Sequence, residues 1–160
     1  MGSKKELGTK HIKRIMDRIK APGLSQKQII NLINFSVTTN EKEIIYLLNS
    51  KKEISFFNYE GIFLPSLQVF RKISEIEIPS VSVDEGAVPY LLNGADVFSS
   101  GITEINEVFQ KDEIITVKNP QGHILCVGLS MESSNAIRDK KGKAIKNIHF
   151  LGDKIWENQI

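Results

Sequence analysis

The chain has 160 residues, which is enough for one ordinary domain or two small ones. Its composition is 41% hydrophobic and 25% charged, and no apolar run approaches the ~18 residues of a membrane span, which excludes a membrane-spanning protein. A single cysteine, Cys126, excludes an internal disulfide, and the basic N-terminal stretch lacks the apolar segment of a secretory signal, so a cytoplasmic protein is expected.

The formal net charge of +2 is unevenly distributed along the chain. Residues 1–77 contain 13 Lys and Arg against 8 Asp and Glu, whereas residues 78–160 contain 8 against 11. Within the acidic half, five bases gather in residues 138–146, called the basic strip below: Arg138, Lys140, Lys141, Lys143 and Lys146. Such a strip is typical of an anion-binding or nucleic-acid-binding surface, and a solvated loop is the alternative.

The N-terminal part of the sequence predicts two helices. Apolar residues from Ile12 to Ile19 follow the spacing of one helix face, in a helix that begins near Thr9 and ends before residues 21–23 (Ala-Pro-Gly). Ser25 and Gln28 form the pattern of a capping box, which predicts a second helix reaching about residue 33. The bases on the outer face of the first helix form a second candidate contact surface, and a solvated face is the alternative: Lys10, Lys13, Arg14 and Arg18.

Three short strands are predicted after these helices. Residues 43–48 form an apolar run typical of a buried strand, and residues 54–57 begin a second one after a polar turn. A turn at Glu60-Gly61 leads into a third strand over residues 62–64, and the type of residues 66–73 is left open. Helices packed on a small antiparallel sheet are therefore expected in this half.

Residues 74–79 mark a predicted domain boundary, because Pro79 restricts the residue before it and is unsuited to a central strand. We therefore expect an N-terminal domain over residues 1–77 and a second domain over residues 78–160. No internal repeat or low-complexity segment interrupts either one.

The second half predicts one helix among several short strands. Val81 and Val83 alternate with polar residues, as in a strand, and Asp84 is a candidate cap for a helix that ends at Gly94. Short apolar runs with turn signals follow: ADVFSSGI, EIITVKN, ILCVGLS and AIKNIHFLG. This pattern indicates a small mixed β-barrel, and the whole chain is assigned to the α+β class.

The sequence offers little support for catalysis, a metal site or a cofactor. His123 and Cys126 have metal-ligand spacing, but one pair falls short of a zinc site, and Cys126 inside an apolar run is expected to be a buried hydrophobe. Phosphate-loop, dinucleotide and nucleophile-elbow patterns are absent. The paired acids at residues 84–85 and 112–113 fit a helix N-terminus and a turn.

Residues 83–102 form the most informative segment. Gly94 and Gly101 are expected to adopt positive φ and to let a ligand approach the backbone, while Ser99 and Ser100 add hydroxyl groups. The alternative is that both glycines only form turns. A surface that contacts phosphates or base edges is therefore one of two interpretations of this segment.

The same residues resemble a known family. VDEGAVPYLLNGADVFSSGI, ILCVGLS and NIHFLGDKIW resemble a PUA domain, the RNA-binding fold of pseudouridine synthases and archaeosine transglycosylases. EGIFLPSLQVFRK upstream resembles the pre-PUA domain of the malignant T-cell-amplified sequence family, translation factors that act with density-regulated protein. The resemblance implies an α/β pre-PUA domain followed by a PUA pseudobarrel, in the order of archaeal single-chain relatives.

The resemblance also implies a binding surface and a ligand. PUA domains hold structured RNA, often a tRNA acceptor end, between the first helix, the following glycine loop and the last strand. In this sequence these parts correspond to Gly94, Ala95, Asp96, Val97, Ser99, Ser100 and Gly101, with Lys146, Asn147 and His149 opposite. The rest of the basic strip, Arg138, Lys140, Lys141 and Lys143, is expected to flank this surface. Residues 103–111 depart from the pattern, because they carry two glutamates and no base before Lys111.

Four functions are consistent with this sequence. The first is a non-catalytic RNA-binding protein of the translation apparatus that contacts tRNA or rRNA on the small ribosomal subunit, with a partner similar to density-regulated protein. The others are a ribosome-biogenesis factor, a specificity subunit of an RNA-modifying enzyme, and a protein scaffold that no longer binds RNA. Isoleucine (23) far exceeds alanine (5) and lysine (17) exceeds arginine (4), which indicates an AT-rich genome, and the resemblance to archaeal single-chain relatives favours an archaeal source.

Overall fold

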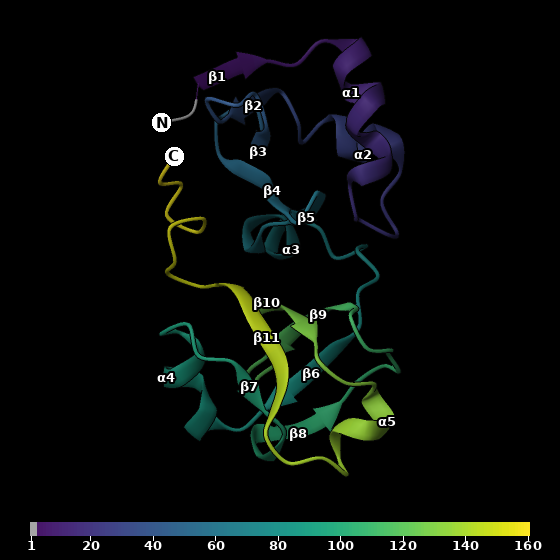
Figure 1. The fold of residues 1–160 in the computed structure, drawn as a ribbon, viewed down its shortest axis with the longest axis vertical. Helices are drawn as coiled ribbons and strands as arrows, with labels where there is room; N and C mark the ends of the chain where they lie inside the picture. The colour runs from purple at the N-terminus through teal and green to yellow at the C-terminus, as the bar shows by residue number, and fades with distance from the viewer. Residues whose placement is uncertain (1–2) are drawn as a thin grey trace. The chain divides into compact units, whose positions relative to one another are not determined.

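The chain divides at a point inside the predicted linker (Figure 1). The computed structural model describes residues 3–160, so that Met1 and Gly2 of the expected first domain lie outside the described residues. One unit contains the chain up to Glu77 together with Lys154–Ile160, and the other contains Ile78–Asp153. The C-terminal segment, which the sequence analysis placed in the second domain, therefore packs with the first.

The first unit is built on a five-stranded antiparallel sheet in the order β1-β2-β3-β4-β5. Its strands are β1 (Ser3–Glu6), β2 (Phe35–Thr38), β3 (Ile44–Leu48), β4 (Ile54–Tyr59) and β5 (Ile62–Pro65). The last three strands were predicted and are confirmed. The first two were not, because each spans only four residues and β1 is exposed along its whole length, so it lacks an apolar alternation.

Short helices pack against this sheet. They are α1 (Thr9–Ile15), continued by the 3₁₀ turn η1 (Met16–Arg18), α2 (Gln26–Ile30) and α3 (Leu67–Lys72). The predicted capping box is confirmed, since Gln28 N donates to Ser25 Oγ at 3.1 Å and Ser25 N donates to Gln28 Oε1 at 2.9 Å. The second helix is shorter than predicted. Buried Ile15 and Ile29 pack in one cluster with Phe56 of β4.

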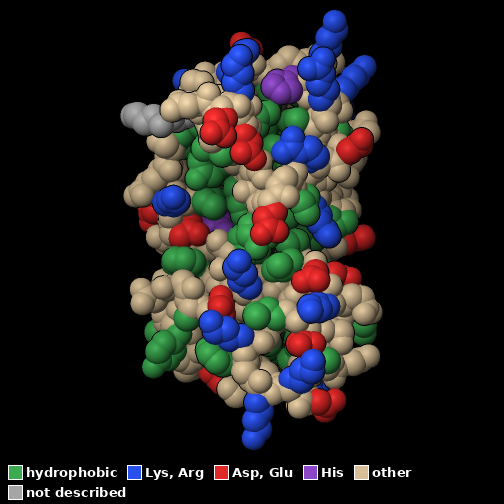
Figure 2. Space-filling view, viewed as in Figure 1, with side chains coloured by type: hydrophobic (Ala, Val, Ile, Leu, Met, Phe, Trp, Pro, Cys, Tyr) green, Lys and Arg blue, Asp and Glu red, His purple; other side chains and the backbone are tan. Residues whose placement is uncertain are grey.

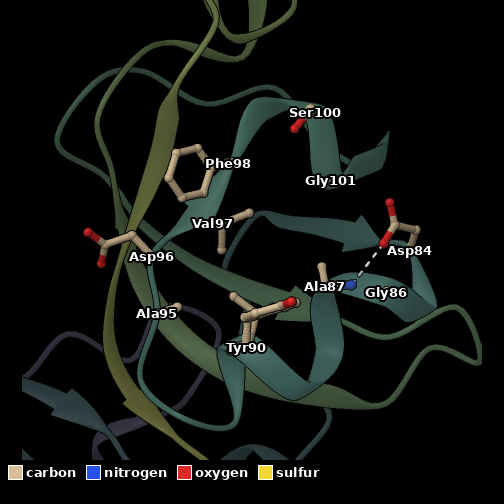
Figure 3. A pocket seen from close by; sticks show the side chains of 11 residues that line it. Asp84, Gly86, Ala87, Tyr90, Ala95, Asp96, Val97, Phe98, Ser100 and Gly101 are labelled. Carbon is tan, nitrogen blue, oxygen red and sulfur yellow. Dashed lines mark hydrogen bonds between the residues drawn. The ribbon is translucent and has the colours of Figure 1, made fainter.

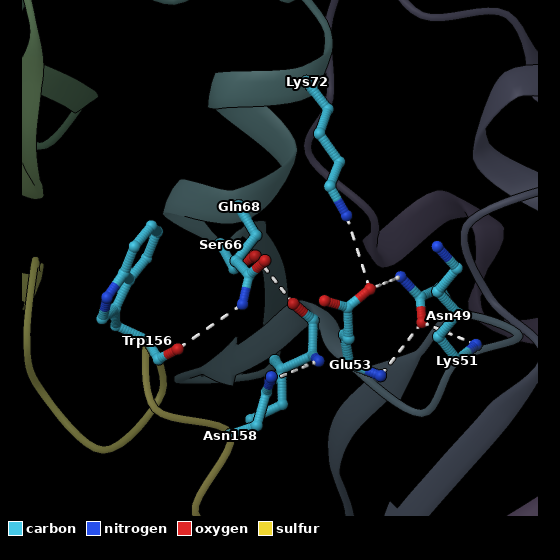
Figure 4. Close-up of polar contacts among 9 residues, drawn as sticks. Asn49, Lys51, Glu53, Ser66, Gln68, Lys72, Trp156 and Asn158 are labelled. Atoms are coloured by element: carbon cyan, nitrogen blue, oxygen red, sulfur yellow. Dashed lines mark hydrogen bonds and ion pairs between the residues drawn. The ribbon is translucent and has the colours of Figure 1, made fainter.

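The C-terminal segment is bound to the first unit by contacts that join distant parts of the sequence (Figure 4). Ile54 N donates to Asn158 Oδ1 at 2.8 Å, and Gln68 Nε2 donates to the Trp156 carbonyl oxygen at 3.5 Å. The guanidinium of Arg71 lies 5.3 Å from the centre of the Trp156 ring, a cation–π contact. These contacts explain why the segment belongs to the first unit although it follows the second in sequence.

The second unit is a six-stranded sheet in the order β7-β11-β10-β9-β6-β8, in which only the β6–β9 pair is parallel. Its strands are β6 (Ser80–Val83), β7 (Val97–Phe98), β8 (Ile102–Ile105), β9 (Ile114–Lys118), β10 (Ile124–Ser130) and β11 (Lys143–Phe150). The edge strands β7 and β8 are separated only by the 3₁₀ turn η3 (Ser99–Gly101), so the sheet curls until it is nearly closed. The predicted α+β class and small mixed barrel are confirmed.

Short helical turns connect the strands of this barrel. They are the 3₁₀ turn η2 (Glu85–Ala87), which runs into α4 (Val88–Leu91), and α5 (Ser134–Ile137), which the sequence analysis missed. The barrel interior is apolar, and Cys126 is completely buried in it. Burial raises the pKa of the Cys126 thiol to about 12, in agreement with its interpretation as a buried hydrophobe. Across residues 3–160, no helix has the length and apolar character needed to cross a bilayer.

Candidate functional site

A pocket of about 400 Å³ opens in the second unit between the η2–α4 turn and the β7–η3 segment (Figure 3). We call it the aromatic pocket, because two exposed aromatic rings lie on its sides. Its lining comes from the segment that the sequence analysis singled out and from the helix before it: Asp84, Gly86, Ala87, Tyr90, Leu91, Ala95, Asp96, Val97, Phe98, Ser100 and Gly101.

Hydrogen bonds hold the helical side of the pocket against the η3 side. Ala87 N donates to Asp84 Oδ1 at 2.9 Å, which confirms Asp84 as a helix cap. The backbone amide of Asp84 donates to the Gly101 carbonyl oxygen at 3.0 Å and thereby ties η2 to η3. The mouth of the pocket is thus fixed by the fold.

The two glycines of the segment have different roles. Gly94 has a φ of +92° and ends α4, as predicted, with its amide donating to the Leu91 carbonyl oxygen at 3.0 Å. The expectation of positive φ at Gly101 is wrong, because Gly101 is not among the positive-φ residues. A Cβ at Gly101 would stand 3.5 Å from the Ala87 Cβ, so a larger side chain there would extend into the pocket. Gly101 is therefore suited to keeping the pocket open.

Asn147 of β11 connects the last strand to the loop that shapes the pocket. Its side-chain Nδ2 donates to the carbonyl oxygens of Leu91 and Ala95, each at 3.0 Å. Its backbone amide donates to Asp96 Oδ1 at 2.9 Å. Asn147 was predicted to contact the ligand, and the structure instead engages its Nδ2 in holding the loop in place.

Two aromatic side chains give the pocket its chemical character, and sequence reasoning missed them as site residues. Tyr90 is 71% exposed and Phe98 is 50% exposed, although large apolar rings are favoured in the interior. Figure 3 shows the Tyr90 ring on the helical side and the Phe98 ring on the strand side, with Val97 between them. The available signal was Phe98 directly after apolar Val97 in a predicted strand, because successive side chains of a strand face opposite sides.

The charges at the pocket are negative. Asp84 and Asp96 are the charged residues in its lining, and no lysine or arginine lines it. The Asp96 carboxylate is partly compensated by Lys143, whose Nζ lies 3.3 Å from Asp96 Oδ2. Carboxylates repel phosphate groups and accept hydrogen bonds from amino groups, so the pocket suits a flat, amino-bearing apolar group better than an anion.

The structure brings five of the fourteen predicted site residues into the lining of the pocket. Ala95, Asp96, Val97, Ser100 and Gly101 line the pocket, whereas Gly94 and Ser99 lie beside it. The basic strip adjoins this segment at one end, where the Ser99 amide donates to the Gly142 carbonyl oxygen at 2.8 Å, and its role in binding stays a prediction. The remaining bases, Arg138, Lys140 and Lys141, are exposed in the turn between α5 and β11.

His149 requires a correction. It was predicted to face the ligand, but its side chain is completely buried. Its Nδ1 lies 2.8 Å from Asp153 Oδ2, and the same carboxylate oxygen accepts a hydrogen bond of 3.0 Å from Phe150 N. The inward orientation of this β11 position, stabilised by Asp153, removes His149 from the surface.

The described residues outside the pocket include one further basic surface, on α1. Among the residues that the structure describes, no three His, Cys, Asp or Glu side chains are grouped to hold a metal ion. Lys10, Lys13 and Arg14 are exposed on α1, and Figure 2 shows Lys and Arg side chains gathered with a histidine at that end of the first unit. This second basic face stays a prediction.

Comparison with known proteins gives the chain a context. The PUA domain family model matches residues 79–151. An uncharacterized protein of Methanocaldococcus jannaschii is 37% identical over 120 residues, covering 74% of this chain and 72% of that protein. Malignant T-cell-amplified sequence 1-A of Xenopus laevis is 31% identical over 161 residues, covering 94% of this chain and 88% of that protein.

Two further similarities extend over most of the chain. Translation machinery-associated protein 20 of Schizosaccharomyces pombe is 28% identical over 128 residues, covering 76% of this chain and 69% of that protein. The crystal structure of a hypothetical protein from Pyrococcus horikoshii superposes with a TM-score of 0.71 at 28% identity, covering 99% of this chain and 100% of the other. Both units are thus found together in the same order in a solved structure.

Proposed function

Because the chain belongs to the malignant T-cell-amplified sequence family and carries a PUA domain, we propose that it is a non-catalytic RNA-binding protein of the translation apparatus. The aromatic pocket is the site at which it binds RNA. The name of the fission-yeast relative, translation machinery-associated protein 20, supports the assignment to translation.

The observation that carries this proposal is the pair of exposed rings at the mouth of a preformed pocket. Tyr90 and Phe98 offer flat apolar surfaces to solvent, and base–aromatic stacking contributes about 1–3 kcal/mol per base in single-stranded nucleic acid binding. Sequence-specific recognition of RNA is directed mainly at unpaired nucleotides whose bases can be turned out and stacked. A pocket of about 400 Å³ with an aromatic ring on each side suits such a base.

The charge of the pocket supports a base as its occupant. Asp84 and Asp96 disfavour a phosphate group there, but their carboxylates accept hydrogen bonds from the amino groups of cytosine, adenine or guanine. Uracil has no amino group, so the pocket should bind it least well. A tRNA acceptor end and the unpaired segments of small-subunit rRNA both present such bases, and these are the RNAs that we assign to the site.

A binding titration with altered rings tests the proposal. The probe is a fluorescently labelled hairpin RNA with a single-stranded 3′ overhang, and the variant is Tyr90→Ala with Phe98→Ala in the full chain. Loss of stacking should weaken affinity about tenfold to a hundredfold. The thermal midpoint should hardly change, because both rings are largely exposed. Unchanged affinity would remove the pocket from the RNA-binding site.

The matched control is Val108→Ala. Val108 is 72% exposed in the same unit and does not line the pocket, so its truncation should leave RNA affinity unchanged. Equal losses in the control and in the ring variant would indicate a non-specific effect of removing exposed apolar surface.

The cellular role is tested by sedimentation of native lysate. A translation factor that works with a partner similar to density-regulated protein should co-sediment with mature small ribosomal subunits. Association with precursor particles alone would favour a ribosome-biogenesis factor, and a stable complex with a modifying enzyme would favour a specificity subunit.

A further inference from the structure

A second hollow of about 440 Å³ lies in the same unit and differs from the aromatic pocket in its charge. The start of β11, the end of β10 and the turn before β9 form it. Three lysines line it, Lys111, Lys143 and Lys146, together with the acids Asp112 and Glu132 and the apolar Met131. We call it the lysine hollow. Lys111 lies outside the basic strip in sequence, and the fold places it in the same hollow as Lys143 and Lys146.

The lysine hollow is positively charged on balance. All three of its lysines are exposed, and Lys143 Nζ is paired with Asp96 Oδ2 at 3.3 Å. One of the two acids is already compensated, because Glu132 Oε1 lies 3.0 Å from the Nζ of Lys140 in the basic strip. The aromatic pocket, by contrast, contains carboxylates and no base in its lining. The aromatic pocket therefore favours the base of a nucleotide, and the lysine hollow favours its phosphate group.

Lys143 connects the two hollows. It lines the lysine hollow, and its Nζ reaches to within 3.3 Å of Asp96 Oδ2 at the aromatic pocket. In the β7–β11 ladder, Lys143 is the register partner of Phe98, the ring on the strand side of the pocket. The pocket and the hollow thus adjoin across one strand pair. Figure 2 shows Lys and Arg side chains over one face of the second unit, interspersed with acids.

We infer that the lysine hollow binds the phosphate backbone of the RNA strand whose unpaired base occupies the aromatic pocket. This inference rests on the proposed function and adds the path of the strand, from the pocket past Lys143 to Lys146 and Lys111. The base in the pocket provides selectivity, and the lysines provide sequence-independent, salt-dependent affinity. Because the base and the phosphates bind at different places, the acidic aromatic pocket does not have to accommodate the negative charge of the RNA.

The test measures how RNA affinity depends on salt in the full chain. The variant is Lys111→Gln with Lys146→Gln, and the probe is the hairpin RNA with a single-stranded 3′ overhang. Each phosphate contact to a single strand contributes about 0.7 to the slope of log affinity against log salt concentration, so losing two should reduce the slope by about 1.4. At about 0.1 M salt, the affinity should fall on the order of tenfold.

Two controls separate this inference from the proposed function. Lys51→Gln with Lys52→Gln removes the same charge from an exposed turn of the first unit and should leave the slope unchanged. Tyr90→Ala with Phe98→Ala should lower the affinity while keeping the slope. A wild-type slope in the Lys111 and Lys146 variant would overturn the strand path and leave the pocket intact, whereas absence of RNA binding by the wild-type chain would overturn both.

Discussion

The backbone amide of Asn147 donates a hydrogen bond of 2.9 Å to the side-chain Oδ1 of Asp96, and this contact joins β11 to the loop before β7. The other oxygen of the same carboxylate, Oδ2, lies 3.3 Å from Lys143 Nζ. Asp96 thus links the last strand, the aromatic pocket and the basic strip. The shape of the pocket therefore depends on Asn147, which does not line it, as well as on Asp96, which does.

Replacing Asn147 with alanine should weaken RNA binding through the loop. The variant loses both Nδ2 hydrogen bonds, to the carbonyl oxygens of Leu91 and Ala95. Loss of such partly buried contacts costs about 1–3 kcal/mol in the free energy of unfolding. We expect lower stability and lower affinity in titrations below the melting temperature. Asn106→Ala, which loses a 2.9 Å bond to Ser80 Oγ away from the pocket, should retain wild-type affinity.

Replacing Gly101 with valine should fill the aromatic pocket without unfolding the chain. The added Cβ stands 3.5 Å from the Ala87 Cβ, an ordinary contact, and the additional methyl groups extend into the pocket. We expect at least about a tenfold loss of RNA affinity, since a stacked base contributes about 1–3 kcal/mol. Gly8→Val is the control, because a Cβ at Gly8 meets no atom within 4 Å. Wild-type affinity of a folded Gly101→Val chain would contradict a base-sized site here.

Glu53 should make the stability of the first unit dependent on pH. The hydrogen bond from Asn49, at 3.0 Å, and the nearby Lys72 ammonium, at 3.4 Å, hold the pKa of the Glu53 carboxyl below its usual value of 4.5 (Figure 4). A carboxyl with a lowered folded-state pKa stabilises the protein above its unfolded pKa, and this contribution disappears as the pH falls through the folded pKa.

The substitution Glu53→Gln tests this dependence. Because Lys72 is 55% exposed and solvent screens the pair, the variant should lose only a few tenths to about 1 kcal/mol at neutral pH. The difference from wild type should vanish in acid, as followed by urea unfolding over a pH series. Glu41→Gln is the control, because Glu41 is exposed and takes part in none of the ion pairs found among residues 3–160. Its effect on stability should not change with pH.

Cys126 should be chemically inert in the folded chain. Its side chain is fully buried, and burial raises the pKa of its thiol from 9.0 to about 12. Because the thiolate is the reactive form, modification by a disulfide reagent in mildly alkaline buffer should be on the order of a thousandfold slower in the native chain than in urea. A native rate near the unfolded rate would contradict the packing of the barrel interior.

The sequence predicted the helix caps and turns, which depend on the side chains of neighbouring residues. The Ser25–Gln28 capping box, the Asp84 cap and the left-handed turn at Gly94 all occur as expected, because each is determined by a few neighbouring residues. The place of Asn158 was not predictable in this way. Its bond to Ile54 joins residues 104 positions apart.

The site was predicted in part for the same reason. The segment containing Gly101 was identified, whereas the exposed rings of Tyr90 and Phe98 depend on which way a one-turn helix and a two-residue strand face. The inward orientation of His149 depends on the register of β11 and on Asp153. Strand alternation limits these orientations to two, but only tertiary packing selects one.

The most direct measurement of the central claim is ultraviolet crosslinking of the full chain to RNA in native lysate, followed by mass spectrometry of the crosslinked peptides. Stacking of an unpaired base in the aromatic pocket predicts crosslinks at Tyr90 or Phe98, and these should disappear when Gly101→Val fills the pocket. Crosslinks confined to the first unit, for example to α1, or their persistence in the Gly101→Val chain would contradict the assignment of the RNA-binding site.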